Sequence, residues 1–324
     1  MSNAFNAPHR VKVETLQRVQ AVIDGLGYKP NQSARSLKTG LRYTFGYMAP
    51  DDDPFDPNPL MGGFLTALCD AAAEAGYRIL LFRPTHDARR AIDDLVAARQ
   101  VDGIILSDIV RDDVRVERLT ELGLPFVTFG KTGAGKPQRW VDVDNTSSME
   151  NVAGFLAQSG HRRVGYIASS SSLPWLQERN DGFLRGAARD GLSVATVYES
   201  PVASDNNESL IRSLRGMLRA PKPPTVLVAA NDMLALAAYE AVREEGLAIG
   251  GDIAVIGYND LPLCQLLVPK LTSVRIPLPR IAREAVDLLL RQLKGDAEPS
   301  AGTLLPAELV VRESFLPRQP PHPI

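Results

Sequence analysis

The chain has 324 residues, of which 44% are hydrophobic and 23% are charged, a composition typical of soluble globular proteins. This length is too great for one ordinary hydrophobic core and suits two or three domains. No apolar run approaches the roughly 18 residues of a membrane helix, and residues 1–10 lack the apolar stretch of a secretory signal. The two cysteines make no disulfide framework, and no Cys or His cluster has metal-ligand spacing. We therefore expect a cytoplasmic protein with no cofactor, no metal and no membrane contact.

The net charge of −2 conceals an uneven distribution along the chain. Residues 1–42 hold seven basic and two acidic side chains, a balance of +5, so the rest of the chain carries −7. A small basic region ahead of an acidic body indicates that the N-terminal region meets a polyanion and that the body does not.

Residues 13–26 have the periodicity of one amphipathic helix. Four aliphatic residues are spaced three or four apart and fall on one face: Leu16, Val19, Ile23 and Leu26. Gly27 ends this helix, and beyond Pro30 a short second helix is expected from about Gln32 to Leu37. The second helix has almost no apolar face of its own, so we expect it to form only against a partner.

From Tyr43 onward, short apolar strands alternate with helices. The expected strands are residues 44–48, 79–82, 103–106, 126–129, 140–143, 164–168, 226–229 and 253–256. The expected helices are residues 60–75, 88–98, 149–158, 181–190, 209–218, 234–245 and 280–293. Such alternation predicts an α/β fold with parallel sheets covered on both faces. The strands are too many for one small sheet, so we predict two doubly wound lobes joined across a cleft.

Polar residues gather where the predicted strands end, and ligands of open parallel sheets bind beyond those carboxyl ends. The types present are Asp and Asn, with one Arg and one Trp. They suit a neutral sugar, because amide and carboxylate groups can bond its hydroxyls and an indole offers an apolar face. The candidate effector-binding residues are Asn58, Asp142, Trp175, Arg179, Asp232, Asn259 and Asp260.

Each of these candidates also has a purely structural interpretation. Arg179 can be a surface ion-pair partner, and Trp175 can pack between the lobes. Either Asn231 or Asp232 can cap the helix that follows them. Turn formation is the alternative for three strand-end residues, Asp142, Asn259 and Asp260.

Two catalytic or nucleotide-binding interpretations fail on their context. Residues 130–136 resemble a phosphate loop, but Pro137 stands where the motif requires Ser or Thr, and a strand rather than a helix follows. The chain has no Gly-x-Ser-x-Gly elbow and no His pair at metal spacing. A two-lobed sugar enzyme would have Asp142 and Asp232 as its only candidate pair of carboxylates. We therefore do not expect an enzyme.

Several motifs, in order along the whole chain, resemble the LacI/GalR family of transcriptional regulators. Residues 27–40 are similar to the end of the family's DNA-binding headpiece and its hinge helix. Residues 14–19 are similar to the start of the third headpiece helix, and residues 2–6 to the end of the recognition helix. The other matches are Asn58-Pro59, Arg179 ahead of Gly182-Phe183, Asn231-Asp232, Gly257-Tyr258-Asn259-Asp260 and the tail at residues 308–314.

This resemblance implies a sugar-responsive repressor that binds a palindromic operator as a homodimer. A small neutral sugar, such as a glucoside, would bind between the lobes and change the affinity for DNA. Leu37 would wedge into a central base step of the minor groove, although an ordinary core position is the alternative. The implied DNA-binding residues are Ser2, Asn3, Asn6, Asn31, Arg35 and Leu37.

The resemblance also implies the domain boundaries. Residues 1–42 would form a partial helix-turn-helix headpiece and the hinge helix. The N-terminal lobe would comprise residues 43–144 and about 276–305, and the C-terminal lobe residues 145–275 and about 306–318.

Three departures from the family pattern leave alternatives open. About twenty residues that begin the family headpiece are absent, so the alternative function is a cytoplasmic sugar-binding module that does not bind DNA. Gly130-Lys131 stands where many relatives have Asp-Arg, and Asn259 replaces a common Asp. The sugar, its action as inducer or co-repressor, the operator and any assembly beyond the dimer are therefore left undetermined.

Overall fold

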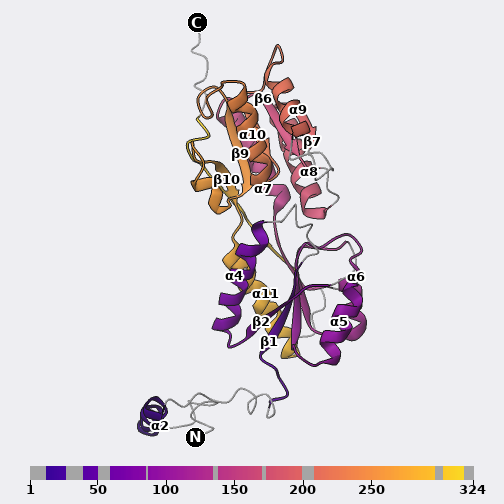
Figure 1. Cartoon of the computed structure of the whole chain (residues 1–324), viewed down its shortest axis with the longest axis vertical. Helices are drawn as coiled ribbons and strands as arrows, with labels where there is room; N and C mark the ends of the chain where they lie inside the picture. The colour runs from indigo at the N-terminus through magenta and orange to yellow at the C-terminus, as the bar shows by residue number, and fades with distance from the viewer. Residues whose placement is uncertain are drawn as a thin grey trace. The chain divides into compact units, whose positions relative to one another are not determined.

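Figure 1 shows the computed structural model of the chain, which divides into two compact units, residues 1–43 and 44–324. The structure describes residues 12–26, 39–49, 59–84, 87–133, 138–169, 173–198, 208–295 and 302–316. In the first unit it describes the helix α2 (Val13–Leu26), at the position that the aliphatic periodicity predicted. Seven predicted site residues lie outside the described ranges: Ser2, Asn3, Asn6, Asn31, Arg35, Leu37 and Asn58.

The second unit contains two six-stranded sheets. The first sheet and its helices are called the N-lobe here. Its strands in spatial order are β11 (Gly302–Leu305), β5 (Trp140–Val143), β4 (Phe126–Phe129), β3 (Gly103–Leu106), β1 (Thr44–Met48) and β2 (Arg78–Phe82), all paired in parallel. The helices on one side of this sheet in Figure 1 are α4 (Pro59–Glu74) and α11 (Leu278–Leu293), and those on the other side are α5 (Ala88–Ala97) and α6 (Val114–Leu122).

The second sheet and its helices form the C-lobe. Its strands in spatial order are β12 (Glu308–Val310), β10 (Thr272–Arg275), β9 (Ala254–Asn259), β8 (Val226–Ala229), β6 (Arg163–Ala168) and β7 (Ser193–Tyr198). All neighbours are parallel except β10 and β12. The helices of the C-lobe are α7 (Asn145–Gln158), α8 (Pro174–Arg189), α9 (Glu208–Leu218) and α10 (Asp232–Glu244), with a short 3₁₀ helix, η3 (Pro262–Gln265).

The chain passes between the lobes at three places: from β5 to α7, from β10 to α11 and from β11 to β12. The first of these crossovers is very short, because β5 ends at Val143 and α7 begins at Asn145. Asp144, the residue between them, caps α7 by accepting a hydrogen bond from the backbone N–H of Ser147 at 2.9 Å. The first turn of α7 is therefore tied directly to the end of an N-lobe strand.

Helices α7 and α8 pack backbone to backbone. A Cβ atom on Gly182 would lie 2.5 Å from the carbonyl oxygen of Thr146, and one on Gly186 would lie 2.9 Å from Cα of Glu150. Larger residues at these two positions would force the helices apart. Since α7 begins at a crossover, this close packing also fixes the position of α8 relative to the crossover.

The predicted two-lobed α/β fold is confirmed, but the strands β7, β10 and β11 were not among those predicted. The helix predicted at residues 181–190 begins a full two turns earlier, at Pro174, because proline is favoured in the first turn of a helix. Helix α6 was not predicted from its polar sequence, and here it is capped by Asp113. The helix predicted at residues 149–158 begins at Asn145. Within the described ranges, no helix has the length and apolar character needed to span a membrane.

Candidate functional site

A cavity that is partly open to solvent is lined by residues of both lobes. The lining is largely apolar, with a few polar groups, which is the usual character of such a site. The lining residues are Leu60, Met61, Asp108, Phe129, Gly130, Asp142, Val143, Asn145, Trp175, Arg179 and Ile276.

Arg179 is a buried cation on the C-lobe wall of this cavity, with only 2% of its surface exposed. Its guanidinium donates from Nε to Oδ1 of Asn145 at 3.0 Å and from Nη1 to the carbonyl of Ala230 at 2.9 Å. Nη2 donates to Oδ1 of Asn259 at 3.2 Å. All three acceptors are neutral, so within the described residues the guanidinium is oriented by hydrogen bonds without an ion pair.

Two aromatic rings enclose the same guanidinium. Its Cζ lies 4.5 Å from the ring centroid of Trp175 and 3.7 Å from that of Tyr258. Cation–π contacts of this kind strengthen when the groups are removed from water. Burial lowers the pKa of Arg179, and the nearby tyrosines oppose that shift. Arg179 is therefore held rigidly, with its direction set before any ligand arrives.

Asn145 connects this arginine to the first crossover. Its Oδ1 accepts from Arg179 and, at 3.2 Å, from the hydroxyl of Tyr258. Its Nδ2 donates to the carbonyl of Val143 at 3.2 Å and lies 3.5 Å from Oε2 of Glu178. One buried amide thus contacts an N-lobe strand end and two side chains of α8.

Asp142 is the buried carboxylate of the N-lobe wall. Its Oδ1 accepts from the backbone N–H of Val143 at 2.8 Å, and its Oδ2 lies 3.8 Å from Nζ of Lys131. Burial raises the pKa of Asp142 to about 7, and the charge of Lys131 opposes this rise. The group therefore changes its protonation state near neutral pH.

Polar contacts also join the two lobes beside the cavity. Nζ of Lys131, on the loop after β4, lies 3.0 Å from Oε1 of Glu178 on α8. Nη2 of Arg111 lies 3.5 Å from Oε1 of Gln177 on the same helix. The Lys131–Glu178 pair has a side-chain exposure of 30% on each partner, so water screens it in part.

The remaining predicted residues, Asp232, Asn259 and Asp260, lie behind the cavity wall and do not line it. Asp232 is fully buried and accepts from the backbone N–H of Leu261 at 2.8 Å and from Oγ of Ser273 at 2.6 Å. Burial raises the pKa of Asp232 to about 6. Asn231, not Asp232, caps α10, by accepting from the N–H of Leu234.

Asn259 and Asp260 both have left-handed backbone conformations, with φ values of 114° and 53°. Asn259 orients Arg179, as described above. The carboxylate of Asp260 forms ion pairs with Arg275 and Arg312, each at 2.7 Å. Asp260 thus ties β10 and the segment after β12 together at the end of β9.

The structure therefore brings Asp142, Trp175 and Arg179 together on one cavity, with Asn259 as a support for the arginine. Sequence reasoning missed Asn145 and Asp108. Asp108 follows the predicted strand at residues 103–106 by two positions, so the strand-end rule could have found it. Asn145 follows the predicted strand at residues 140–143 by two positions, so the same rule could have found it, although its contacts with α8 come from residues more than thirty positions away.

Comparisons with known proteins agree with this architecture. The family model described as a periplasmic binding protein-like domain matches residues 153–315. The HTH-type transcriptional regulator AglR of Rhizobium meliloti is 33% identical over 336 residues, an alignment that covers 100% of this chain and 92% of AglR. The chain belongs to the LacI family of transcriptional regulators.

Solved structures of LacI-family regulators share the fold of this family member. A regulatory protein of the LacI family from Chloroflexus aggregans superposes with a TM-score of 0.77 at 29% identity, covering 85% of this chain and 99% of that one. A complex of the transcriptional regulator CelR with cellobiose superposes with a TM-score of 0.72 at 26% identity, covering 97% of this chain and 94% of CelR. These relatives are named as regulators and not as enzymes.

Proposed function

We propose that this LacI-family chain is a cytoplasmic, sugar-responsive repressor that binds a palindromic operator as a homodimer and takes a small neutral sugar in the cavity. It would act as a binding protein and not as an enzyme. The observation that carries the proposal is the link from Arg179 on the cavity wall to Asn145 at the crossover. A ligand that contacts Arg179 favours one arrangement of the crossover over another, and operator affinity changes with it.

The chemistry of the cavity supports a neutral sugar. Apolar side chains and the ring of Trp175 suit the faces of a pyranose, and Asp142 and Arg179 can accept from and donate to its hydroxyls. The relative CelR is known as a complex with cellobiose, a neutral disaccharide. A glucoside is therefore the sugar class that we assign to this site.

The operator-binding part of the proposal rests on the sequence. The residues assigned to DNA are Ser2, Asn3, Asn6, Asn31, Arg35 and Leu37. They lie in a region of net charge +5, as expected for contact with phosphates. Leu37 is assigned the minor-groove wedge, which requires a second copy of the hinge helix from a partner chain.

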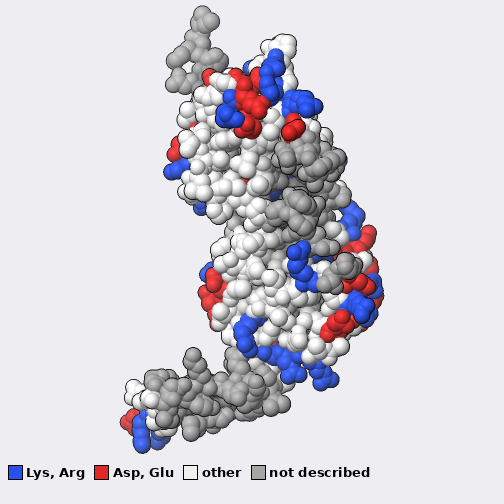
Figure 2. Space-filling view, viewed as in Figure 1, with Lys and Arg blue, Asp and Glu red and all other residues white. Residues whose placement is uncertain are grey.

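Exposed aliphatic residues on the C-lobe support the dimer. Leu266 and Val268, on the loop between η3 and β10, are 82% and 91% exposed. Figure 2 shows few charged side chains on the part of the visible face around α4 and β10. Exposed apolar groups on such a surface favour burial against another protein.

The test of operator binding starts with duplexes selected from a random library by the full chain, followed by fluorescence anisotropy. We expect specific binding that Leu37→Ala weakens at least tenfold. Leu184→Ala, on the exposed side of α8, should leave it unchanged. Binding that is weak, salt-sensitive and indifferent to Leu37→Ala would reject the repressor and leave a sugar-binding module.

The test of the sugar site is calorimetric titration with cellobiose, maltose, trehalose and sucrose. Arg179→Lys should abolish binding of the sugar that the parent chain takes, because lysine cannot reproduce the planar fork of donors. Arg185→Lys, six residues further along α8 and with a side chain that is 61% exposed, is the matched control. The bound sugar should also change operator affinity in the parent chain. If the bound sugar leaves the operator affinity of the parent chain unchanged, the proposed response to sugar is contradicted.

A further inference from the structure

The loop after β3 holds a strained residue at the cavity wall. Asp108 lines the cavity, and its φ of 47° lies in the left-handed region that residues other than glycine seldom adopt. Holding a residue in this region costs free energy, and residues held this way gather at ligand-binding sites. The question is therefore what holds Asp108 in this conformation and what the conformation achieves.

A buried ion pair at the start of α6 holds the loop. Arg115 Nη2 donates to the carbonyls of Ser107 at 3.1 Å and Asp108 at 2.9 Å. The same guanidinium binds the carboxylate of Asp113, with Nη2 2.7 Å from Oδ2 and Nε 2.9 Å from Oδ1. Burial alone would raise the pKa of Asp113, but its bonds to Arg115 hold that pKa below the ordinary value. Asp113 thus stays charged and keeps Arg115 in place.

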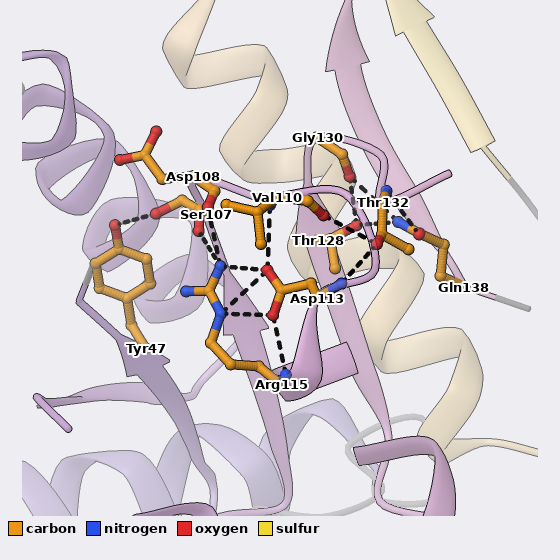
Figure 3. A network of polar contacts seen from close by, with 10 residues as sticks. All are labelled: Tyr47, Ser107, Asp108, Val110, Asp113, Arg115, Thr128, Gly130, Thr132 and Gln138. Atoms are coloured by element: carbon orange, nitrogen blue, oxygen red, sulfur yellow. Dashed lines mark hydrogen bonds and ion pairs between the residues drawn. The ribbon is translucent and has the colours of Figure 1, made fainter. Parts of the chain in front are cut away.

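The same network reaches the loop after β4 (Figure 3). Oγ1 of Thr132 accepts from the backbone N–H of Asp113 and donates to the carbonyl of Val110, both at 3.0 Å. Gln138 accepts from the N–H of Thr132 and donates to the carbonyl of Gly130 at 3.2 Å. The loops after β3 and β4, which both border the cavity, are therefore bonded to each other as one wall.

Within this wall the hydrogen-bond network contacts the backbone around Asp108. The side chain of Asp108 points away from the network. Figure 3 shows the carboxylate of Asp108 directed away from the guanidinium of Arg115. Gly130, the lining residue of the neighbouring loop, has no side chain, and its own φ is 110°. Asp108 and Asp142 are thus the two carboxylates among the described lining residues.

We propose that Asp108 is a ligand-contacting, specificity-determining residue of the sugar site and that Arg115 is its positioning residue. The inference rests on the proposed function and deepens it. The carboxylate accepts hydrogen bonds from a hydroxyl pair of the neutral sugar. A site built to bond a hydroxyl binds analogues that lack it more weakly, because that hydrogen bond is then not made. The loop bonded by Arg115 sets where that carboxylate lies.

The test compares Asp108→Asn with Asp112→Asn by calorimetric titration of the full chain with cellobiose, maltose, trehalose and sucrose. Asp112 is the matched control, since it lies in the same loop with a φ of 54° but is exposed and does not line the cavity. Asparagine tolerates the left-handed conformation, so both variants should fold with unchanged melting temperatures. We expect Asp108→Asn to bind the parent's sugar at least tenfold more weakly and Asp112→Asn to bind it equally well.

The role of Arg115 is tested with Arg115→Lys alone and combined with Asp108→Asn. If Arg115 acts through Asp108, the double variant binds the sugar no more weakly than Asp108→Asn, and Arg115→Lys changes the order of preference among the four sugars. Additive losses with an unchanged order of preference would show a structural role only and overturn the positioning role.

The outcomes separate this inference from the proposed function. A parent chain that binds one of the sugars while Asp108→Asn binds it equally overturns only the role of Asp108. A parent chain that binds none of the four overturns the assigned sugar class and this inference with it. If Arg115→Lys fails to fold, the comparison of Asp108→Asn with Asp112→Asn still decides whether Asp108 contacts the sugar.

Discussion

Arg179 donates from Nε to Oδ1 of Asn145 at 3.0 Å, so a cation on the cavity wall is bonded to the first residue of the helix that follows a lobe crossover. The bond is buried, and neither partner is free to exchange it for water. Any displacement of Arg179 therefore moves or breaks a contact at the crossover.

The first prediction concerns Asn145 itself. Asn145→Ala leaves Nε of Arg179 without its acceptor, whereas the hydroxyl of Tyr258 keeps its hydrogen bond with Oγ of Ser148 at 2.8 Å. Unpaired buried donors cost about 1–3 kcal/mol each, so the free energy of unfolding should fall by about that amount. Urea denaturation measures the change, with Ser147→Ala, on the exposed side of the same turn, as the control. An unchanged free energy of unfolding would show that the contact contributes nothing.

The second prediction concerns the ion pair between the lobes. Lys131→Met and Glu178→Gln should each weaken sugar binding two- to fivefold, and the double variant should be no worse than either one. The pair is half-buried, and such pairs contribute about 0.2–1 kcal/mol. The cycle is measured by calorimetric titration, with Arg185→Met and Glu150→Gln, a pair within the C-lobe, as the control cycle. Strict additivity of the two single effects would contradict a coupled contact.

The third prediction is a pH dependence of stability that comes from Asp142 and Asp232. Burial raises their pKa values to about 7 and about 6, above the roughly 4 of an unfolded aspartate. The folded chain then holds more protons than the unfolded chain, so their contribution to stability falls as pH rises from about 4 to 7.

Asp142→Asn tests this pH dependence, because asparagine cannot ionise. The variant should lose part of the decline between pH 4 and 7 and be more stable than the parent at pH 8, by on the order of 2 kcal/mol. Denaturation curves over the pH range give the comparison. Asp144→Asn is the control, since asparagine also caps a helix. If the stability of the Asp142→Asn variant declines as steeply between pH 4 and 7 as that of the parent, the pH dependence comes from other groups.

The fourth prediction concerns the packing of α7 against α8. Gly182→Ala would place a Cβ 2.5 Å from the carbonyl of Thr146, so the helices must separate and stability should fall by about 1–3 kcal/mol. Gly216→Ala, in α9, has open space around it and should instead gain about 0.5–1 kcal/mol. The two free energies of unfolding should thus change in opposite directions. A similar gain in both variants would show that the helices tolerate the added methyl group.

Much of the fold follows from local pattern alone. The largely apolar runs at residues 103–106, 126–129 and 226–229 are strands with those bounds, because a strand buried on both faces favours apolar residues at nearly every position. The strand-end rule also found Asp142, Trp175 and Arg179, which line one cavity. These predictions needed only period, residue type and the geometry of parallel sheets.

What the sequence could not determine is which strand-end carboxylates face the cavity. Asp232 and Asp260 have the same residue type and the same kind of position as Asp142. Yet their oxygens are bonded to Ser273 and Arg312, which are brought beside them by folding. Asp108 does line the cavity, and its place on the wall depends on a network that reaches Arg115 and Gln138. Local sequence determined where acids occur, and only the tertiary structure decided which of them find their partners inside the protein, because those partners lie far away along the chain.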